Sequence, residues 1–134
     1  MATSMRNPGF IRQAIAEATI ADGVACIVGT ADYSAAVAGS DPTSGVIGLA
    51  KVDGGGSVAS GDTVDIVTSG IYPGVAMASI TQGQAVTVGN SAGGLKPAAP
   101  SAGANVMVLG TAQEDASSGE RVAVQINIYL MQGA

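Results

Sequence analysis

The side chains that could do chemistry in this sequence are carboxylates. Glu114 and Asp115 are adjacent, and Glu120 follows them across a short loop. Paired carboxylates can act as acid and base, or as nucleophile, in glycoside hydrolysis. Aromatic side chains, which would provide a platform for a sugar, make up only 3% of the chain. A solvated turn therefore explains these three acids better than a hydrolase site.

Two other patterns could hold a ligand. Asp53, Asp62 and Asp65 could bind a cation, but their spacing is not that of an EF-hand, and Asp62 stands in a turn, where aspartate is favoured for hydrogen bonds to the backbone. Gly54-Gly55-Gly56 lacks the Gly-Lys-Ser/Thr of a phosphate-binding loop. We expect neither a metal nor a cofactor.

Composition excludes further classes of function. The 134 residues contain no histidine, which removes the usual general base and the commonest metal ligand. The formal net charge of −5 has the wrong sign for direct binding to nucleic acid. No apolar run is long enough for a transmembrane helix, and the apolar neighbours of Cys26 indicate a buried, inert thiol. We expect a protein without catalysis, small-molecule substrate or membrane partner.

Short β-branched runs separated by turn signals such as Asp22-Gly23 predict the elements. Strands at intervals of about ten residues are typical of a small barrel or sandwich, so the predicted fold class is all-β. Residues 30–44 and 97–103 are predicted exposed loops. The expected strands cover residues 24–30, 46–52, 63–69, 83–88, 95–98, 106–112 and 121–130.

The same unit of two strands and a crossing loop occurs twice. Ile47-Gly48-Leu49-Ala50 matches Leu109-Gly110-Thr111-Ala112, and the segment from Gly61 to Ile66 matches that from Gly119 to Val124. The sequence therefore predicts a pseudo-repeated sheet.

Residues 1–20 are predicted to form an N-terminal arm, and residues 21–134 a single β domain. The apolar positions between residues 10 and 20 fit a helical spacing better than alternation. A short helix and an arm that orders only on a partner are both open. Phe10, Ile11 and Ile15 could form an apolar contact on such an arm or add a strand to a partner.

Other adaptable side chains could form contacts between subunits. Met131, just after the last predicted strand, is the best candidate. Tyr33, Tyr72 and Tyr129 could each place an apolar body and a polar tip at an interface, although Tyr72 and Tyr129 are also expected at equivalent positions of the two repeat copies.

The order of these segments resembles that of the capsid decoration, or cement, proteins of tailed bacteriophages. Each segment alone is ordinary β-turn chemistry, so the resemblance depends on their order and spacing. It spans about residues 20 to 128 and is carried by Ala21-Asp22-Gly23-Val24, Val46-Ile47-Gly48-Leu49-Ala50, the segment from Gly61 to Gly70, that from Gly83 to Val88, Val108-Leu109-Gly110-Thr111-Ala112 and Gly119-Glu120-Arg121-Val122.

This resemblance implies a small β-barrel or β-tulip-like domain on the outer surface of a viral capsid, made in the cytoplasm of a bacterial host. The family is typically a homotrimer at three-fold or quasi-three-fold positions. The implied partner is the major capsid protein, and the implied function is mechanical: the protein bridges neighbouring capsid subunits against the pressure of the genome.

Two hypotheses from other classes were weighed against this one. A non-catalytic β-sandwich binding module of an adhesin or a tail-associated protein would recognise glycans and predicts exposed aromatic side chains near a loop cluster. A small acid-dependent hydrolase would use Glu114, Asp115 or Glu120. The absence of histidine weighs against the hydrolase.

Overall fold

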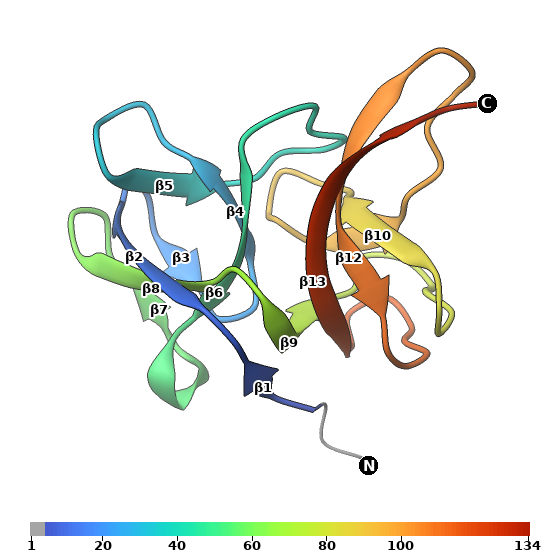
Figure 1. The fold of residues 1–134 in the computed structure, drawn as a ribbon. Coiled ribbons are helices and arrows are strands. Elements are labelled where there is room, and N and C mark those ends of the chain that lie inside the picture. Colours follow the sequence, from blue (N-terminus) through green and yellow to red (C-terminus); the bar gives the residue numbers. More distant parts are fainter. Residues whose placement is uncertain (1–4) are drawn as a thin grey trace.

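The computed structural model describes residues 5–134, and the regular structure within them is almost entirely β-strand (Figure 1). The exception in this range is one turn of 3-10 helix, Asp53–Gly55. The predicted all-β fold class is confirmed. Residues 1–4 of the predicted arm lie outside the described residues. No helix within residues 5–134 is long and apolar enough to cross a membrane.

Five strands pair in a closed ring, on the left of Figure 1. Neighbours in the ring are antiparallel except β2 and β5, which are parallel and pair at only two positions. Mostly small side chains fill the interior. The order around the ring is β2 (Ile11–Ala16), β5 (Ser34–Val37), β4 (Ala25–Val28), β6 (Val46–Lys51) and β8 (Thr63–Val67). The short strands β3 (Ile20–Ala21) and β7 (Ser57–Val58) pair with each other.

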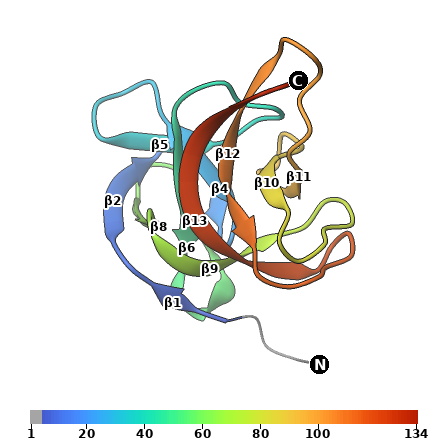
Figure 2. The same ribbon diagram turned by 45° about the vertical axis from the view of Figure 1, so that its right-hand side comes forward.

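Six antiparallel strands form the second sheet, which packs beside the ring (Figure 2). Between ring and sheet lies the larger core, to which both contribute apolar side chains. The strand order is β1 (Asn7–Pro8), β9 (Gly70–Val75), β13 (Arg121–Gln132), β12 (Asn105–Ala112), β10 (Ala85–Val88) and β11 (Leu95–Pro97).

The predicted repeat appears in the strand register. In the ring, Leu49 of β6 lies opposite Val67 of β8. In the sheet, Thr111 of β12 lies opposite Gln125 of β13. These four positions correspond in the two copies of the sequence pattern. Tyr72 and Tyr129 are not equivalent, because Tyr72 lies in β9 whereas Tyr129 lies in β13 opposite Val108.

Each copy contains a glycine that allows close contact between strands. A Cβ atom at Gly48 would overlap the carbonyl oxygen of Val67, and one at Gly110 would overlap that of Gln125. A register irregularity lies near each glycine: near Gly48 it is in the pairing of β4 with β6, and at Gly110 it is in the pairing of β12 with β13. The absence of a side chain therefore fixes how closely the two strands of each unit approach.

The N-terminal segment differs from the prediction. Residues 11–16 form strand β2, and the expected short helix is wrong. The helical spacing depends on Ile11 and Ile15, and both are exposed in the structure. The buried residues are the smaller Ala14 and Ala16, which are two positions apart, as the alternation of a strand requires. Because β1 and β2 pair with β9, β8 and β5, residues 7–16 belong to the sheets in the free chain.

Two other boundaries differ. The predicted loop 30–44 contains β5, in which Ala35 is fully buried. Strand β9 continues through Pro73, although proline is rare in the interior of a strand. Proline lacks an N–H donor, and it is tolerated there because β9 pairs only with β13 beyond Ile71.

The two close-contact glycines generate a stability prediction. We expect Gly48→Ala and Gly110→Ala each to lower the free energy of unfolding by about 1–3 kcal/mol, because the added methyl group forces backbone apart. Urea unfolding monitored by circular dichroism measures the change. Gly39→Ala is the control, since a Cβ atom there has open space around it. Equal stability of all three variants would contradict the account of close strand contact.

Candidate interaction surface

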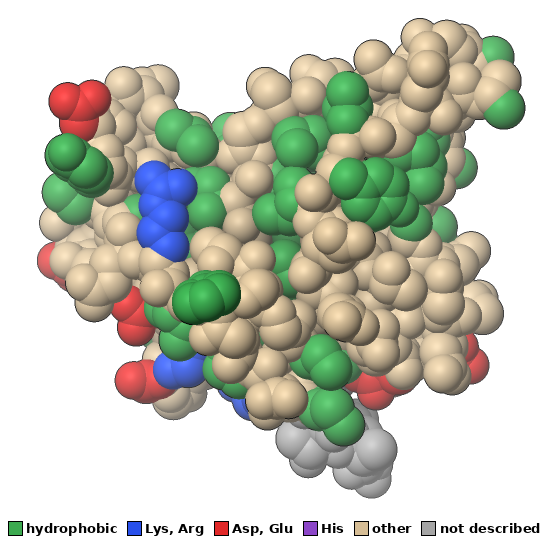
Figure 3. All heavy atoms as spheres, in the orientation of Figure 1, with side chains coloured by type: hydrophobic (Ala, Val, Ile, Leu, Met, Phe, Trp, Pro, Cys, Tyr) green, Lys and Arg blue, Asp and Glu red, His purple; other side chains and the backbone are tan. Residues whose placement is uncertain are grey.

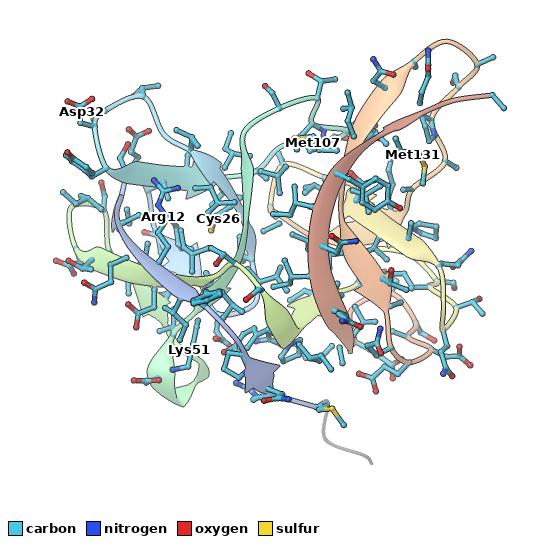
Figure 4. All side chains as sticks on the ribbon, viewed as in Figure 1. Arg12, Cys26, Asp32, Lys51, Met107 and Met131 are labelled. Carbon is cyan, nitrogen blue, oxygen red and sulfur yellow. The ribbon has the colours of Figure 1, made fainter. Side chains whose placement is uncertain are left out.

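Exposed large hydrophobic side chains gather on one side of the ring. Phe10 is 80% exposed and Tyr33 is 81% exposed, while Ile11 and Ile15 are each nearly half exposed. All of them lie on β2 or next to it, since the Ile15 amide donates to the Tyr33 carbonyl at 2.8 Å. Together with the exposed Arg12 they are called the barrel face below. Figure 3 shows hydrophobic side chains on both sides of a basic one there, and Figure 4 identifies that residue as Arg12.

The backbone at Phe10 is fixed although its ring is exposed. Its N–H donates to Ser69 Oγ at 2.8 Å, and its carbonyl accepts from the amide and the hydroxyl of Thr68 at 2.9 and 3.2 Å. A side chain presented from an ordered backbone loses less entropy on binding than one on a mobile arm. Of the predicted contact residues, Ile11 and Ile15 therefore lie on strand β2, and Phe10 lies directly before it on a backbone held by hydrogen bonds; their role in binding a partner stays a prediction.

A carboxylate holds the turn that presents Tyr33. Glu17 Oε2 accepts hydrogen bonds from the Thr30 amide (2.7 Å), the Ala31 amide (2.8 Å) and the Ser34 hydroxyl (2.6 Å). These bonds, the one from Ser34 first, lower the pKa of Glu17 to about 2. Within this turn Tyr33 has a φ of 60°, in the left-handed region that is uncommon for residues other than glycine. The sequence pattern did not identify Glu17, because its donors lie 13 to 17 residues away.

A second carboxylate connects the ring to the sheet. The side chain of Asp22 is fully buried, and its Oδ1 accepts from the Tyr72 hydroxyl (2.6 Å) and the Val52 amide (2.8 Å). Its Oδ2 lies 3.1 Å from Arg121 and 3.9 Å from Arg6. Burial, followed by the bond to Asp22, raises the pKa of Tyr72 to about 12. The start of the described chain is thereby fixed beside β9.

Met131 lies on a different sheet from the barrel face, near the upper end of β13 (Figure 4). Beyond Ile126, β13 pairs with β12 but no longer with β9, so residues 127–132 have one unpaired edge. Along it Tyr129 and Leu130 are exposed and Met131 is half-buried. An uncharged open edge of this kind is a surface on which another chain can pair. The role of Met131 in a subunit contact stays a prediction.

The acids considered as catalytic residues each hold a backbone amide. Glu114 accepts from the Ala123 amide, Asp115 from the Gln82 amide and Glu120 from the Ser117 amide, all at 2.7–2.8 Å. These bonds give all three acids a role in fixing the ends of strands and turns.

Two further features bear on ligands. A hollow of about 370 Å³ lies between the segments around residues 41 and 100, and the Asp41–Lys96 ion pair at 2.9 Å borders it. Cys26 is buried, as predicted, and burial raises the pKa of its thiol to about 12. Within residues 5–134, no three His, Cys, Asp or Glu side chains are grouped closely enough to hold a metal ion.

Comparison with known proteins reveals a structural likeness. No protein-family model matches the chain, and no curated protein matches it in sequence. Among solved structures, the chain is similar to the crystal structure of the head fiber gp8.5 N base in bacteriophage phi29, with a TM-score of 0.64 and 20% sequence identity. The similarity covers 88% of this chain and 93% of that one. The two chains share a fold over almost their whole length.

The Glu17 hydrogen bonds generate a prediction about pH. Because folding lowers the pKa of Glu17 from 4.5 to about 2, its stabilising contribution is complete above pH 4.5 and is lost as the pH falls towards 2. We expect Glu17→Gln to be less stable than the wild type at pH 7, and the difference in the free energy of unfolding to shrink across this window. Urea titrations between pH 7 and pH 2 measure it.

Asp32→Asn is the matched control for Glu17→Gln, because Asp32 lies in the same turn and its side chain has no hydrogen-bond or ion-pair partner within residues 5–134. We expect this variant to follow the wild type at every pH. A wild-type advantage over Glu17→Gln that does not change with pH would show that Glu17 does not act through its charged form.

Proposed function

We propose that this protein is a non-catalytic structural component of a bacteriophage virion, made in the bacterial cytoplasm and bound to the outer surface of the head. The observation that carries the proposal is the fold shared with the base of a phage head fiber. The sequence resemblance to decoration proteins, found from segment order alone, supports the same placement. Its role is to bridge neighbouring major capsid protein subunits and so stabilise the shell.

The barrel face is the proposed contact with the head. It offers Ile11 and Ile15 from strand β2, Phe10 from the residue directly before that strand, and Tyr33 from a turn held by Glu17. Exposed aromatic and aliphatic side chains on a fixed backbone have the character of interface anchors. Neither a ligand pocket nor a metal is needed for this function.

The proposed assembly is a homotrimer. Three copies around one axis present the barrel face three times, so that a modest contact becomes durable attachment through avidity. In this assembly the open edge of β13, with Met131, lies against a neighbouring subunit. That contact would cover an edge that otherwise invites non-specific pairing.

One observation favours the alternative of a glycan-binding module. Phe10 and Tyr33 are the highly exposed aromatic side chains that this hypothesis predicts, and Tyr33 lies in a turn. Binding to soluble glycans in the absence of any binding to heads would favour this alternative over the virion role.

Attachment to heads can be tested by co-sedimentation with empty heads of the phage that encodes the chain. We expect the wild type to pellet with the heads, and Phe10→Ser to bind about tenfold more weakly because an apolar anchor is lost. Phe10→Tyr keeps the ring and should bind like the wild type. Equal melting temperatures of the variants show that folding is intact. Equal binding of all three proteins would show that Phe10 is not part of the contact.

The subunit contact can be tested without heads. Sedimentation equilibrium should give three times the 12.9 kDa mass of one chain, and Met131→Asp should shift the population towards single chains, because it places a charge in an apolar contact. Gln125→Glu, on the same strand and exposed, adds the same charge where β13 is paired on both sides, outside the proposed open-edge contact, and is the control. A wild-type monomer at every concentration would contradict the trimer.

A further inference from the structure

The barrel face contains a cation that has no partner among residues 5–134. Lys51 pairs with Asp53 at 2.8 Å and Lys96 with Asp41 at 2.9 Å, while Arg6 and Arg121 both approach the Asp22 carboxylate. Arg12 is exposed, and in residues 5–134 no hydrogen bond, ion pair or ring contact involves its side chain. It is the only one of the five Lys and Arg residues in this state within the described part of the chain.

The side chains around Arg12 indicate what kind of partner its guanidinium would meet. Phe10 is exposed two residues before Arg12, on the same side of the extended chain, whereas Ile11 and Ile15 on β2 expose their side chains on the opposite side of the strand. Figure 4 shows the Arg12 side chain on the front of the ring, beside β2, and Figure 3 shows it flanked by hydrophobic groups. A partner that covers Phe10 and the hydrophobic groups beside Arg12 also removes water from the guanidinium.

An arginine that loses water without gaining an acceptor destabilises an interface, because the desolvated charge is not compensated. A carboxylate is the acceptor that best fits the planar guanidinium, with two parallel hydrogen bonds. The surface that fits the barrel face therefore has a carboxylate set among apolar groups. This is a requirement of charge complementarity, and it narrows the kind of partner.

We propose that Arg12 pairs with a carboxylate of the major capsid protein, surrounded by apolar side chains that pack on Phe10, Ile15 and Tyr33. This inference rests on the proposed function and adds to it the chemical character of the partner surface. The Glu17 bonds that fix the turn at Tyr33 keep one border of the site in place.

A second copy of this chain is the competing occupant. Most carboxylates of the chain already accept hydrogen bonds or pair with cations, so few of them could pair with Arg12 of a second copy without losing those interactions. A head subunit with its own acidic group does not need to break any of those interactions. The oligomeric mass of Arg12 variants distinguishes the two occupants.

The experiment measures binding to empty heads for the wild type, Arg12→Gln, Arg12→Lys and Lys51→Gln. Arg12→Gln and Lys51→Gln change the net charge equally, but Lys51 lies on β6, pairs with Asp53 and is not one of the residues that define the barrel face. We expect Arg12→Gln to weaken binding at least about tenfold, Arg12→Lys to lie between it and the wild type, and Lys51→Gln to bind normally. Raising the salt concentration should weaken the wild type more than Arg12→Gln.

Each outcome has a defined meaning. Melting temperatures should not change, since the Arg12 side chain makes no hydrogen bond or ion pair with residues 5–134 that the substitution could remove. Wild-type binding with no loss in Arg12→Gln would overturn this inference and leave the proposed function standing. A changed oligomeric mass of Arg12→Gln in the absence of heads would show that Arg12 contacts a second copy of the chain. That result would overturn the inference of a capsid carboxylate. Failure of the wild type to bind heads would overturn the proposed function and this inference with it.

Discussion

The buried carboxylate of Asp22 is the interaction on which the relative placement of ring and sheet depends. It lies between β3 and β4 of the ring side, yet its partners include Tyr72 in β9 and Arg121 in β13. A buried charge is tolerated only when hydrogen bonds and counter-charges surround it. Ring and sheet must therefore come together in one arrangement to satisfy this group. Arg6 belongs to the same network, through Tyr72 and Asp22. It directly precedes β1, which pairs with β9 and leads into β2.

A fixed N-terminal segment changes how attachment is understood. On a free arm, Phe10 and Ile15 would have to be ordered at the moment of binding, at a cost in entropy. In the structure β2 is already paired with β8, and the adjacent turn is held by Glu17. The barrel face is thus already ordered in the free protein, so the proposed attachment would not carry the entropic cost of ordering an arm.

Most strands of this fold could be predicted from sequence, because Val and Ile alternate in them and turn residues separate them. Strand β2 could not, because its buried residues are Ala14 and Ala16, which carry little hydrophobic signal beside the exposed Ile11 and Ile15. Phe10, Ile11 and Ile15 could be recognised from sequence as apolar side chains near a polar N-terminal segment, and their role in a contact stays a prediction. The partners of Asp22 could not be found, since they lie 30, 50 and 99 positions away and depend on the packing of two sheets.

The central claim is that the protein attaches to the outside of a phage head through its barrel face. Electron cryomicroscopy of heads purified with and without this chain tests the claim directly. The account predicts additional density on the outer surface that fits the ring and sheet, with β2 and Tyr33 towards the shell and a capsid carboxylate opposite Arg12. Heads that are identical with and without the chain, or density that places β2 away from the shell, would contradict it.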